Sequence, residues 1–501
     1  MTPELLTCRS PFVSFKFFIL RSYCVSSCVL AIVLSLPVAL TAYPPLVDYP
    51  NHLARAYIEY RYSFTPSFQA LYERVSTPVP NSATDLLIPL LLPYVLPTAA
   101  GRIFLVVTVV LFVLGCHMLG RSLHDRPTPS ALLCTFLVYN SALLYGFLNY
   151  VFGVALYTVV LAFWLRHRQE WTLPPFILVV ALAFALYAAH LSAYAFLAVS
   201  IIVVTILDSA KHHLCLRGAL LNLSPLAPPA AAFLFLAPTH RHATLEWHGV
   251  SAKLVGLLGL VRSYDARLDF AVGVIWAVFA LWILTHLNRV RVSRSAVLIG
   301  SMFVMAWILS PSVVGLWSPV DARFVLPAAL LLILSVDVLS WNRLGRTLFA
   351  CVLVASLLRV GYVWATWTTL DHKIADAVDM LAALPDGVTV YPAFFPPSGI
   401  DRQKRDRSFE HVIHYATISR NAHLPTLLAV RGYFTLAFRE EPRYHGPAPD
   451  LRAEDLEGYD CVWTYHAPAT AEALLAANGT LLAEHDGFAI WRLSKPSRTV
   501  P

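Results

Sequence analysis

The chain has 501 residues, of which 57% are hydrophobic and only 13% are charged, and its mean hydropathy is +0.63. Soluble domains carry roughly 25% charged residues, so this composition excludes a soluble globular protein and predicts a polytopic α-helical membrane protein. The net charge of +7 does not indicate a nucleic-acid partner, because the basic residues are scattered in twos and threes between apolar runs. The eight cysteines show no paired spacing, so they predict neither a zinc site nor a disulfide framework.

Eleven apolar windows are each close to the roughly 20 residues that a helix needs to cross a bilayer. They lie near residues 24–42, 102–120, 130–146, 148–165, 172–190, 192–208, 217–237, 269–286, 295–310, 324–340 and 346–366. Basic residues occupy every second connection, which is the positive-inside pattern. We therefore expect about 11 spans, with the N-terminus cytoplasmic, an uncleaved signal anchor first, and residues 43–101 on the outer, periplasmic side.

The first periplasmic loop opens with the polar stretch "YPPLVDYPNHLARAYIEY" at residues 43–60. A helix over residues 49–62 would align four ionisable side chains on one face: Asp48, His52, Arg55 and Glu59. Its aromatic face predicts that the helix lies on the membrane surface. Two interpretations stay open, because an Asp shortly before a Pro also caps helices and the other three residues also suit a solvated face.

A second apolar stretch in this loop, residues 84–102, is interrupted by Pro89, Pro93 and Pro97. Proline inside a helix removes a backbone hydrogen bond and kinks or breaks it. We therefore expect a surface-lying or re-entrant element here rather than another span.

The composition changes after residue 366 and predicts a small periplasmic α/β domain over residues 367–501, following a transmembrane domain over residues 1–366. "GVTVYPAF" and "YDCVWTY" are typical of strands, "PATAEALLAAN" of a helix, and "GTLLAEHDGFAIWRL" of a strand pair. No glycine-rich phosphate-binding motif occurs in it, so no nucleotide site is predicted.

Ionisable residues are almost absent from the apolar windows and gather in the connections expected on the outer face. A proton- or ion-coupled carrier is expected to keep such groups near the bilayer centre, where they mark the transport pathway. Their distribution favours an enzyme that works at the outer membrane–water boundary.

Three short motifs, "PLVDYPNHLAR", "YGFLNYVFGVAL" and "VDARFVLPAALLL", together with this layout, resemble the GT-C membrane glycosyltransferases. This superfamily includes the protein O-mannosyltransferases and the transferases that place aminoarabinose on lipid A. The resemblance implies a GT-C-like fold in a bacterial inner membrane. It also implies transfer of a hexose or pentose from a polyprenyl-phosphate donor to a glycan, lipid or protein acceptor in the envelope. It implies Asp48 as general base and a substrate-binding set of His52, Arg55, Glu59 and Arg323.

Many members of the superfamily carry a doubled acidic motif in the first loop, whereas a single Asp48 stands beside Tyr49 in this chain. A divalent metal cofactor is therefore possible but not required by the sequence. Two other functions stay open: a transporter or flippase of a lipid-linked sugar, and a non-enzymatic envelope assembly protein. The sequence does not identify the sugar or the acceptor.

Overall fold

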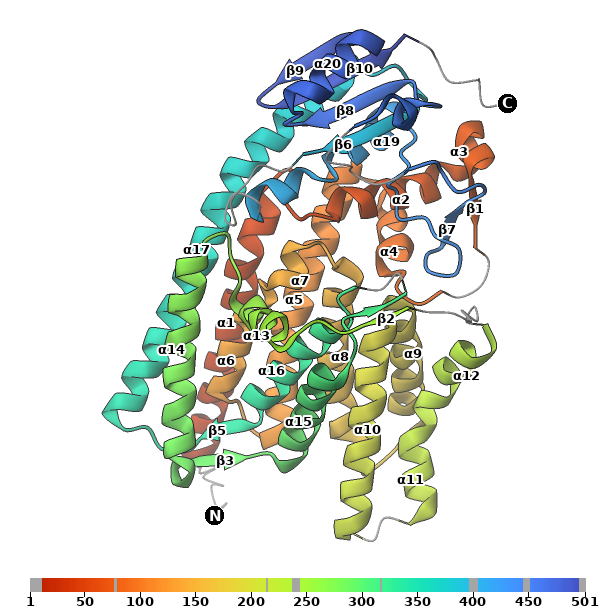
Figure 1. Cartoon of the computed structure of the whole chain (residues 1–501). Coiled ribbons are helices and arrows are strands. Elements are labelled where there is room, and N and C mark those ends of the chain that lie inside the picture. The colour runs from red at the N-terminus through yellow and green to blue at the C-terminus, as the bar shows by residue number, and fades with distance from the viewer. Residues whose placement is uncertain are drawn as a thin grey trace, which may run out of the picture.

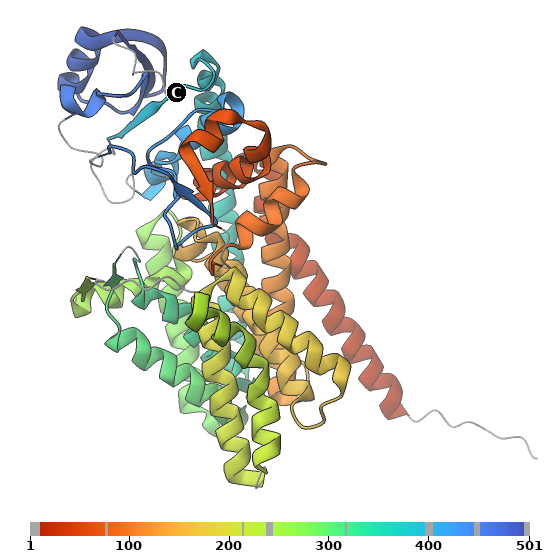
Figure 2. The same cartoon turned by 90° about the vertical axis from the view of Figure 1, so that its right-hand side faces the viewer.

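The computed structural model describes residues 11–75, 79–212, 215–236, 244–315, 318–395, 404–444 and 451–494. The chain forms a helical bundle with an α/β cap at one end; the cap is built from the C-terminal part of the chain, and the first loop lies against it (Figure 1). The N-terminal helix begins at the opposite end of the bundle. A perpendicular view shows the cap at the same end, above the bundle (Figure 2).

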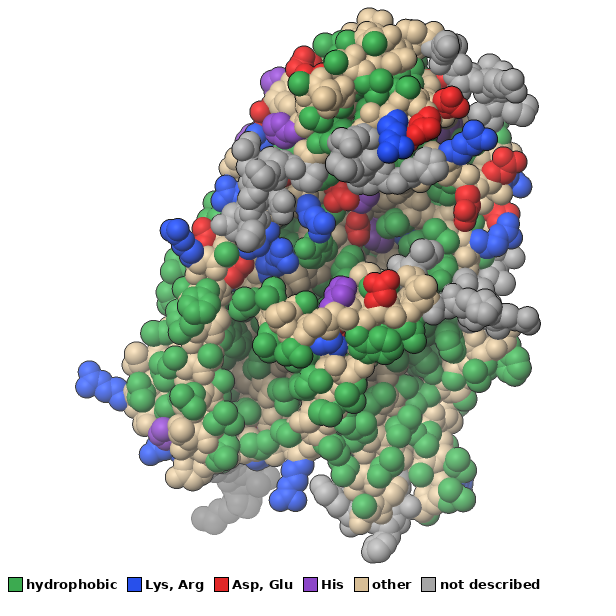
Figure 3. Space-filling model, in the orientation of Figure 1, with side chains coloured by type: hydrophobic (Ala, Val, Ile, Leu, Met, Phe, Trp, Pro, Cys, Tyr) green, Lys and Arg blue, Asp and Glu red, His purple; other side chains and the backbone are tan. Residues whose placement is uncertain are grey.

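Within the described ranges, six helical segments are long and apolar enough to cross a membrane by length and composition. They correspond to α5 (Pro97–His124), α8 (Leu148–His167), α10 (Leu191–His212), the run of α11 (Leu216–Leu223) and α12 (Ala227–Leu236), α14 (Ala266–Thr285) and α17 (Arg343–Met380). Hydrophobic side chains cover the bundle surface, while acidic side chains gather on the cap and the loops beside it (Figure 3). This distribution is that of a protein embedded in a membrane.

The other bundle helices are shorter or interrupted. They are α1 (Pro11–Leu40), α6 (Pro129–Thr135), α7 (Ser141–Leu144), α9 (Leu173–Ala189), α15 (Arg294–Leu309) and α16 (Val325–Leu334). Every predicted window falls on helical structure, but α16 is followed by strand β5 (Val336–Val338), which pairs with β3 (Val290–Val292). Ten helical residues rise only about 15 Å, half of the ~30 Å hydrocarbon core, so the number of spans stays a prediction.

The first loop folds into α2 (Tyr49–Arg61), α3 (Pro66–Leu71), β1 (Tyr72–Arg74) and α4 (Ala83–Leu91). The predicted helix over residues 49–62 is thus confirmed, but its predicted position on the membrane surface is wrong. Nine of its 13 residues are buried, because α4 packs on one side and the C-terminal part of the chain covers another. The proline-interrupted stretch forms α4 and then a turn, and α5 begins at Pro97.

The cap contains a four-stranded sheet in the order β6-β8-β10-β9. Its strands are β6 (Val390–Phe394), β8 (Cys461–Tyr465), β9 (Gly479–His485) and β10 (Phe488–Leu493), and α20 (Ala469–Asn478) packs against it. Strands β6 and β8 are parallel and the other two pairs antiparallel, so the predicted strands, strand pair and helix are confirmed. Helix α17 continues without a break through residue 367, so the apolar bundle passes into the cap within one helix.

Two elements tie the cap to the first loop. Strand β7 (Leu436–Phe438) pairs antiparallel with β1, and α19 (Tyr415–Arg420) packs against α2. One hydrophobic cluster extends from α1 in the bundle to β10 in the cap. Residues that begin α2 therefore lie at the boundary between bundle and cap. The remaining helix and strands are α13 (Val250–Leu258) and the short pair of β2 (Leu245–Glu246) with β4 (Val313–Val314).

Candidate active site

Two of the sequence motifs meet at Asp48. The backbone N–H of Asp48 donates to the carbonyl of Tyr145 at 3.1 Å, and the neighbouring Gly146 adopts φ +82°. A Cβ on Gly146 would lie 2.6 Å from the Asp48 nitrogen, closer than real Cβ atoms come. Only glycine gives both this backbone conformation and this approach. The turn between α7 and α8 therefore fixes the position of Asp48.

Asp48 occupies the N-cap position of α2, but its carboxylate makes no capping hydrogen bond. The carboxylate oxygen Oδ1 lies instead 3.3 Å from Nε2 of His411, which comes from the cap. Both side chains are mostly buried, with exposures of 20% for Asp48 and 17% for His411. The helix-cap interpretation therefore does not account for this carboxylate, which is paired across the boundary between bundle and cap.

The pKa of His411 reflects this pairing. Burial alone would lower it, but the hydrogen bond that His411 donates to Asp48 and the charges of Asp48 and Glu410 raise it above its ordinary value of 6.5.

We expect the Asp48–His411 pair to make stability depend on pH. A histidine whose pKa is raised by folding contributes stability that is complete below its unfolded value and is lost as pH rises through the folded value. The unfolding temperature of the wild type minus that of His411→Gln should therefore fall as the pH is raised from below the ordinary histidine pKa of 6.5 to above the raised pKa of His411. A difference that stays constant or grows over this range would contradict the pairing.

Asp48 faces a cavity of about 320 Å³ between the bundle and the cap. Its lining contains three of the five sequence-predicted site residues, Asp48, His52 and Arg323, whereas Arg55 and Glu59 are not among the lining residues. The other residues that line it are Asn81, Phe147, Leu148, Asn149, Tyr150, His190, Ser318, Leu428, Val430, Tyr433 and Phe434. The residues that line the cavity thus come from the first loop, α8, the end of α9, the segment before α16 and the cap.

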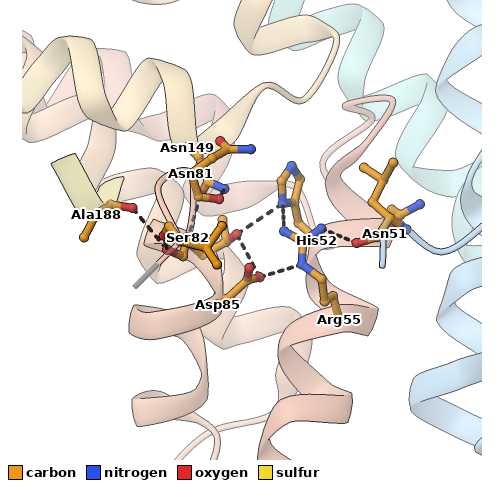
Figure 4. Close-up of polar contacts among 11 residues, drawn as sticks. Asn51, His52, Arg55, Asn81, Ser82, Asp85, Asn149 and Ala188 are labelled. Atoms are coloured by element: carbon orange, nitrogen blue, oxygen red, sulfur yellow. Dashed lines mark hydrogen bonds and ion pairs between the residues drawn. The ribbon is translucent and has the colours of Figure 1, made fainter. Parts of the chain in front are cut away.

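Arg55 belongs to a buried network behind the cavity wall (Figure 4). Its Nε donates to Asp85 Oδ1 at 2.8 Å, and a second nitrogen donates to the carbonyl of Leu428 at 2.9 Å. Its guanidinium also lies 4.2 Å from the ring centre of Phe434. Both side chains of the Arg55–Asp85 pair are fully buried. Arg55 thus fixes α2 to α4 and to the cap.

His52 is the link between this network and the cavity. Its Nδ1 accepts from Arg55 at 3.0 Å, because a guanidinium has no acceptor, and lies 3.1 Å from the hydroxyl of Thr84. Burial, followed by the charge of Arg55, holds the pKa of His52 well below its ordinary range. His52 is therefore neutral at pH 7 and presents no positive charge to a phosphate.

Removing one member of the Arg55–Asp85 pair should destabilise the protein strongly. Asp85→Ala leaves a fully buried guanidinium without its carboxylate, and breaking a buried pair in this way costs about 3–5 kcal/mol. The matched control is Arg74→Gln, which removes the half-exposed partner of Glu59 and should cost about 1 kcal/mol or less. Thermal unfolding in detergent measures the stability of both variants. Equal losses of stability in Asp85→Ala and Arg74→Gln would contradict a larger contribution of the buried pair.

Glu59 lies away from the cavity. Its Oε2 is 3.1 Å from Nε of Arg74, and burial raises the pKa of its carboxyl group. Its contacts serve the packing of α2 against the loop that follows it.

Arg323 lies in the single 3₁₀ turn Asp321–Phe324 that leads into α16. The hydroxyl of Tyr150 donates to the backbone carbonyl of Arg323 at 2.6 Å and so fixes this turn against α8. Asp321 accepts from the hydroxyl of Ser312 at 2.7 Å and lies 3.5 Å from Nζ of Lys253. Arg323 is one of the residues that line the cavity.

Several cavity residues were missed by sequence reasoning. Asn149 holds the loop before α4, because its side chain accepts from the N–H of Thr84 at 2.8 Å and donates to the carbonyl of Asn81 at 2.6 Å. It lies in the quoted "YGFLNY" motif, which was a usable signal. His190 packs edge-on against Tyr150 with ring centres 5.4 Å apart, and the short gap between two spans was its only signal. His411 stood in a part of the chain with no recognisable motif.

A second basic group lies on the other side of the Gly146 turn. The guanidinium carbons of Arg262 and Arg407 lie 5.3 and 5.9 Å from the ring centre of Tyr145. Arg262, Arg407 and Lys404 line one small pocket together with Tyr145. Nζ of Lys404 also lies 3.8 Å from Oδ2 of Asp269. This group adds positive charge close to the backbone that carries Asp48.

No group of three or more His, Cys, Asp or Glu side chains suited to a metal ion occurs in the parts of the chain that the structure describes. Neither a family model nor a curated protein matches the sequence.

Among solved structures, the chain is similar to the crystal structure of ArnT from Cupriavidus metallidurans in the apo state, with a TM-score of 0.51 and 12% identity. It is similar also to ArnT from the same organism bound to undecaprenyl phosphate, with a TM-score of 0.50 and 12% identity. Each comparison covers 94% of this chain and 98% of the ArnT chain. ArnT is a GT-C glycosyltransferase, so the chain has the GT-C fold that its sequence motifs predicted.

Proposed function

We propose that the protein is a membrane glycosyltransferase that moves a sugar from a polyprenyl-phosphate donor to an acceptor of the cell envelope. The observation that carries the proposal is the cavity between bundle and cap, because Asp48 and Arg323 both belong to its lining. The comparison with solved structures supports the proposal, because the chain shares the fold of ArnT and one of the two ArnT structures has undecaprenyl phosphate bound.

The reaction is a displacement at the anomeric carbon of the donor sugar. The acceptor hydroxyl forms a new bond to this carbon while the bond to the phosphate oxygen breaks, and polyprenyl phosphate leaves. Asp48 accepts the proton of the hydroxyl as general base. Arg323 stabilises the charge that develops on the leaving phosphate, to which a guanidinium offers two parallel N–H donors. His411 is a positioning residue that holds the carboxylate.

The proposed orientation places the cap and the cavity on the periplasmic side. The polyprenyl tail then stays in the bilayer beside the bundle, and only the phosphate and sugar reach the cavity. This arrangement follows from the positive-inside pattern of the sequence. Acceptor specificity is then a property of the residues that roof the cavity, among them Leu428, Tyr433 and Phe434.

Arg323→Gln tests whether Arg323 binds the phosphate of the donor. We expect it to weaken the binding of undecaprenyl phosphate by about 10-fold to 100-fold, since a hydrogen bond to a charged group contributes about 1.5–3 kcal/mol. Fluorescence competition with the purified full chain in detergent measures this affinity. The control is Arg262→Gln, which removes a positive charge from the neighbouring basic group and should leave the affinity within about threefold. If Arg262→Gln has the larger effect, the phosphate binds beside Tyr145 rather than at Arg323.

A flippase of a lipid-linked sugar and an assembly protein predict a different outcome. Either function would survive Asp48→Asn, because neither needs a general base. A transferase would not survive it.

A further inference from the structure

Strands β3 and β5 lie at the end of the bundle opposite the cap (Figure 1), and a second, larger cavity lies next to them. Its volume is about 510 Å³, within the ~300–1,000 Å³ range of small-molecule sites. It is lined by residues of α6, α14, α15, α16 and α17 and of the two strands. The residues that line it are Pro129, Ser130, Leu133, Trp276, Phe279, Ala280, Ile283, Leu284, Leu287, Val292, Val297, Leu332, Ile333, Ser335, Val336, Val338, Trp341 and Phe349.

The lining of this cavity is almost entirely apolar. Its two hydroxyl groups already donate hydrogen bonds within the protein, that of Ser335 to the carbonyl of Leu332 at 2.7 Å and that of Ser130 to the hydroxyl of Thr128 at 3.2 Å. The rings of Phe279, Trp282 and Trp341 are nearly parallel, with interplanar angles of 8° to 13° and centres 5.8 to 6.5 Å apart. Phe279 and Trp341 belong to the lining, and such a largely apolar aromatic wall is complementary to a hydrocarbon chain.

Arginine residues surround this apolar wall. Arg289 and Arg291 lie between the lining residues Leu287 and Val292, and Arg294 and Arg343 begin the helices α15 and α17 beside them. Arg291 approaches Asp337 at 3.4 Å, and that buried carboxylate is already bound by Arg126 at 2.7 Å. Among the described residues, no carboxylate lies within ion-pair distance of Arg289, Arg294 or Arg343. The rim therefore carries a surplus of positive charge that the protein itself does not neutralise.

We propose that this cavity binds an anionic glycerophospholipid, with an acyl chain against the aromatic wall and the phosphate among the rim arginines. The positive-inside rule explains basic residues at this end of the bundle, but it does not explain an apolar cavity that opens beside them. An apolar cavity rimmed by unpaired guanidinium groups is complementary to a lipid with an apolar chain and an anionic headgroup. The site is separate from the Asp48 cavity, so the proposal does not depend on the proposed transferase activity.

The test measures the lipid that stays with the purified full chain after detergent exchange, by mass spectrometry per mole of protein. Ala280→Phe fills the cavity from α14, and its control Ala277→Phe adds the same ring one helical turn away, at a residue that does not line the cavity. Arg294→Gln with Arg343→Gln removes rim charge, and its control is Arg121→Gln with Arg166→Gln, two exposed arginines of other helices. We expect retained anionic phospholipid to fall at least about fivefold in the test variants and to stay within about twofold in the controls.

A measurement on the wild type complements these variants. Phosphatidylglycerol added to the delipidated protein in detergent should raise its unfolding temperature, and phosphatidylcholine at the same concentration should not, because a ligand that binds the folded state stabilises it. Equal stabilisation by both lipids would overturn the proposal, as would equal lipid loss in test and control variants. Retention of a polyprenyl phosphate that Ala280→Phe displaces would also overturn it and would assign the cavity to the isoprenoid tail.

Discussion

Asp48→Asn should yield a folded protein that has lost sugar transfer by about 10²- to 10⁴-fold, the range that general-base catalysis contributes. The amide has nearly the shape of the carboxylate and still offers an oxygen to the N–H of His411, but it cannot accept the acceptor's proton. Because Asp48 makes no capping hydrogen bond to α2, folding does not depend on its charge at that helix end. The rate of product formation per mole of membrane-inserted protein measures the loss.

Asp265→Asn is the matched control for this variant. Asp265 also begins a helix, next to the end of the bundle that carries the Asp48 cavity. Its carboxylate accepts from the N–H groups of Arg267 and Leu268 at 2.8 and 2.9 Å. Asparagine caps helices as well as aspartate does, so transfer should be unchanged. Equal activity losses in Asp48→Asn and Asp265→Asn would contradict a chemical role for Asp48.

Gly146→Ala should reduce transfer by about 10²-fold, even though the residue contributes no side chain to the site, because misplacing a catalytic group by ~1 Å can cost this much. The new methyl group would lie 2.6 Å from the Asp48 nitrogen and 3.0 Å from its Cα, so the backbone of Asp48 has to move. An L-residue with the φ of +82° also costs about 1–2 kcal/mol. Product formation and unfolding temperature should therefore both fall.

Gly361→Ala separates this effect from a general response to glycine substitution. Gly361 lies within α17, and no atom lies within 4 Å of the position of its Cβ. Alanine favours the helix by about 0.5–1 kcal/mol relative to glycine, so this variant should keep its activity and gain slightly in stability. A Gly146→Ala variant with full activity would show that the close approach to Asp48 does not position the carboxylate.

Much of the fold could be predicted from local patterns. The apolar windows predicted helices because membrane helices need long apolar runs, and the alternating residues of "GVTVYPAF" and "YDCVWTY" predicted two strands of the cap. The helix at residues 49–61 was predicted from the spacing of its ionisable residues. These patterns could not predict the burial of that helix. The residues that cover it include Thr426 and Leu428, which lie more than 350 residues further along the chain.

The candidate site shows the same limit. Asp48, His52 and Arg323 were predicted and share the cavity, but spacing could not distinguish a guanidinium that faces a ligand from one that is already paired. Arg55 has the spacing of a ligand-binding residue and is instead paired with Asp85, 30 residues further on. His411 was beyond sequence reasoning, because its role depends on the cap folding back onto the first loop.

The most direct test of the account is a mass-resolved comparison of envelope glycolipids, glycans and glycoproteins from cells that carry the wild type or Asp48→Asn at matched membrane abundance. The account predicts that one species loses the mass of a single sugar in the mutant, and that mass identifies the sugar class. If every species is unchanged while deletion of the whole chain alters the cells, the protein is not a glycosyltransferase that uses Asp48.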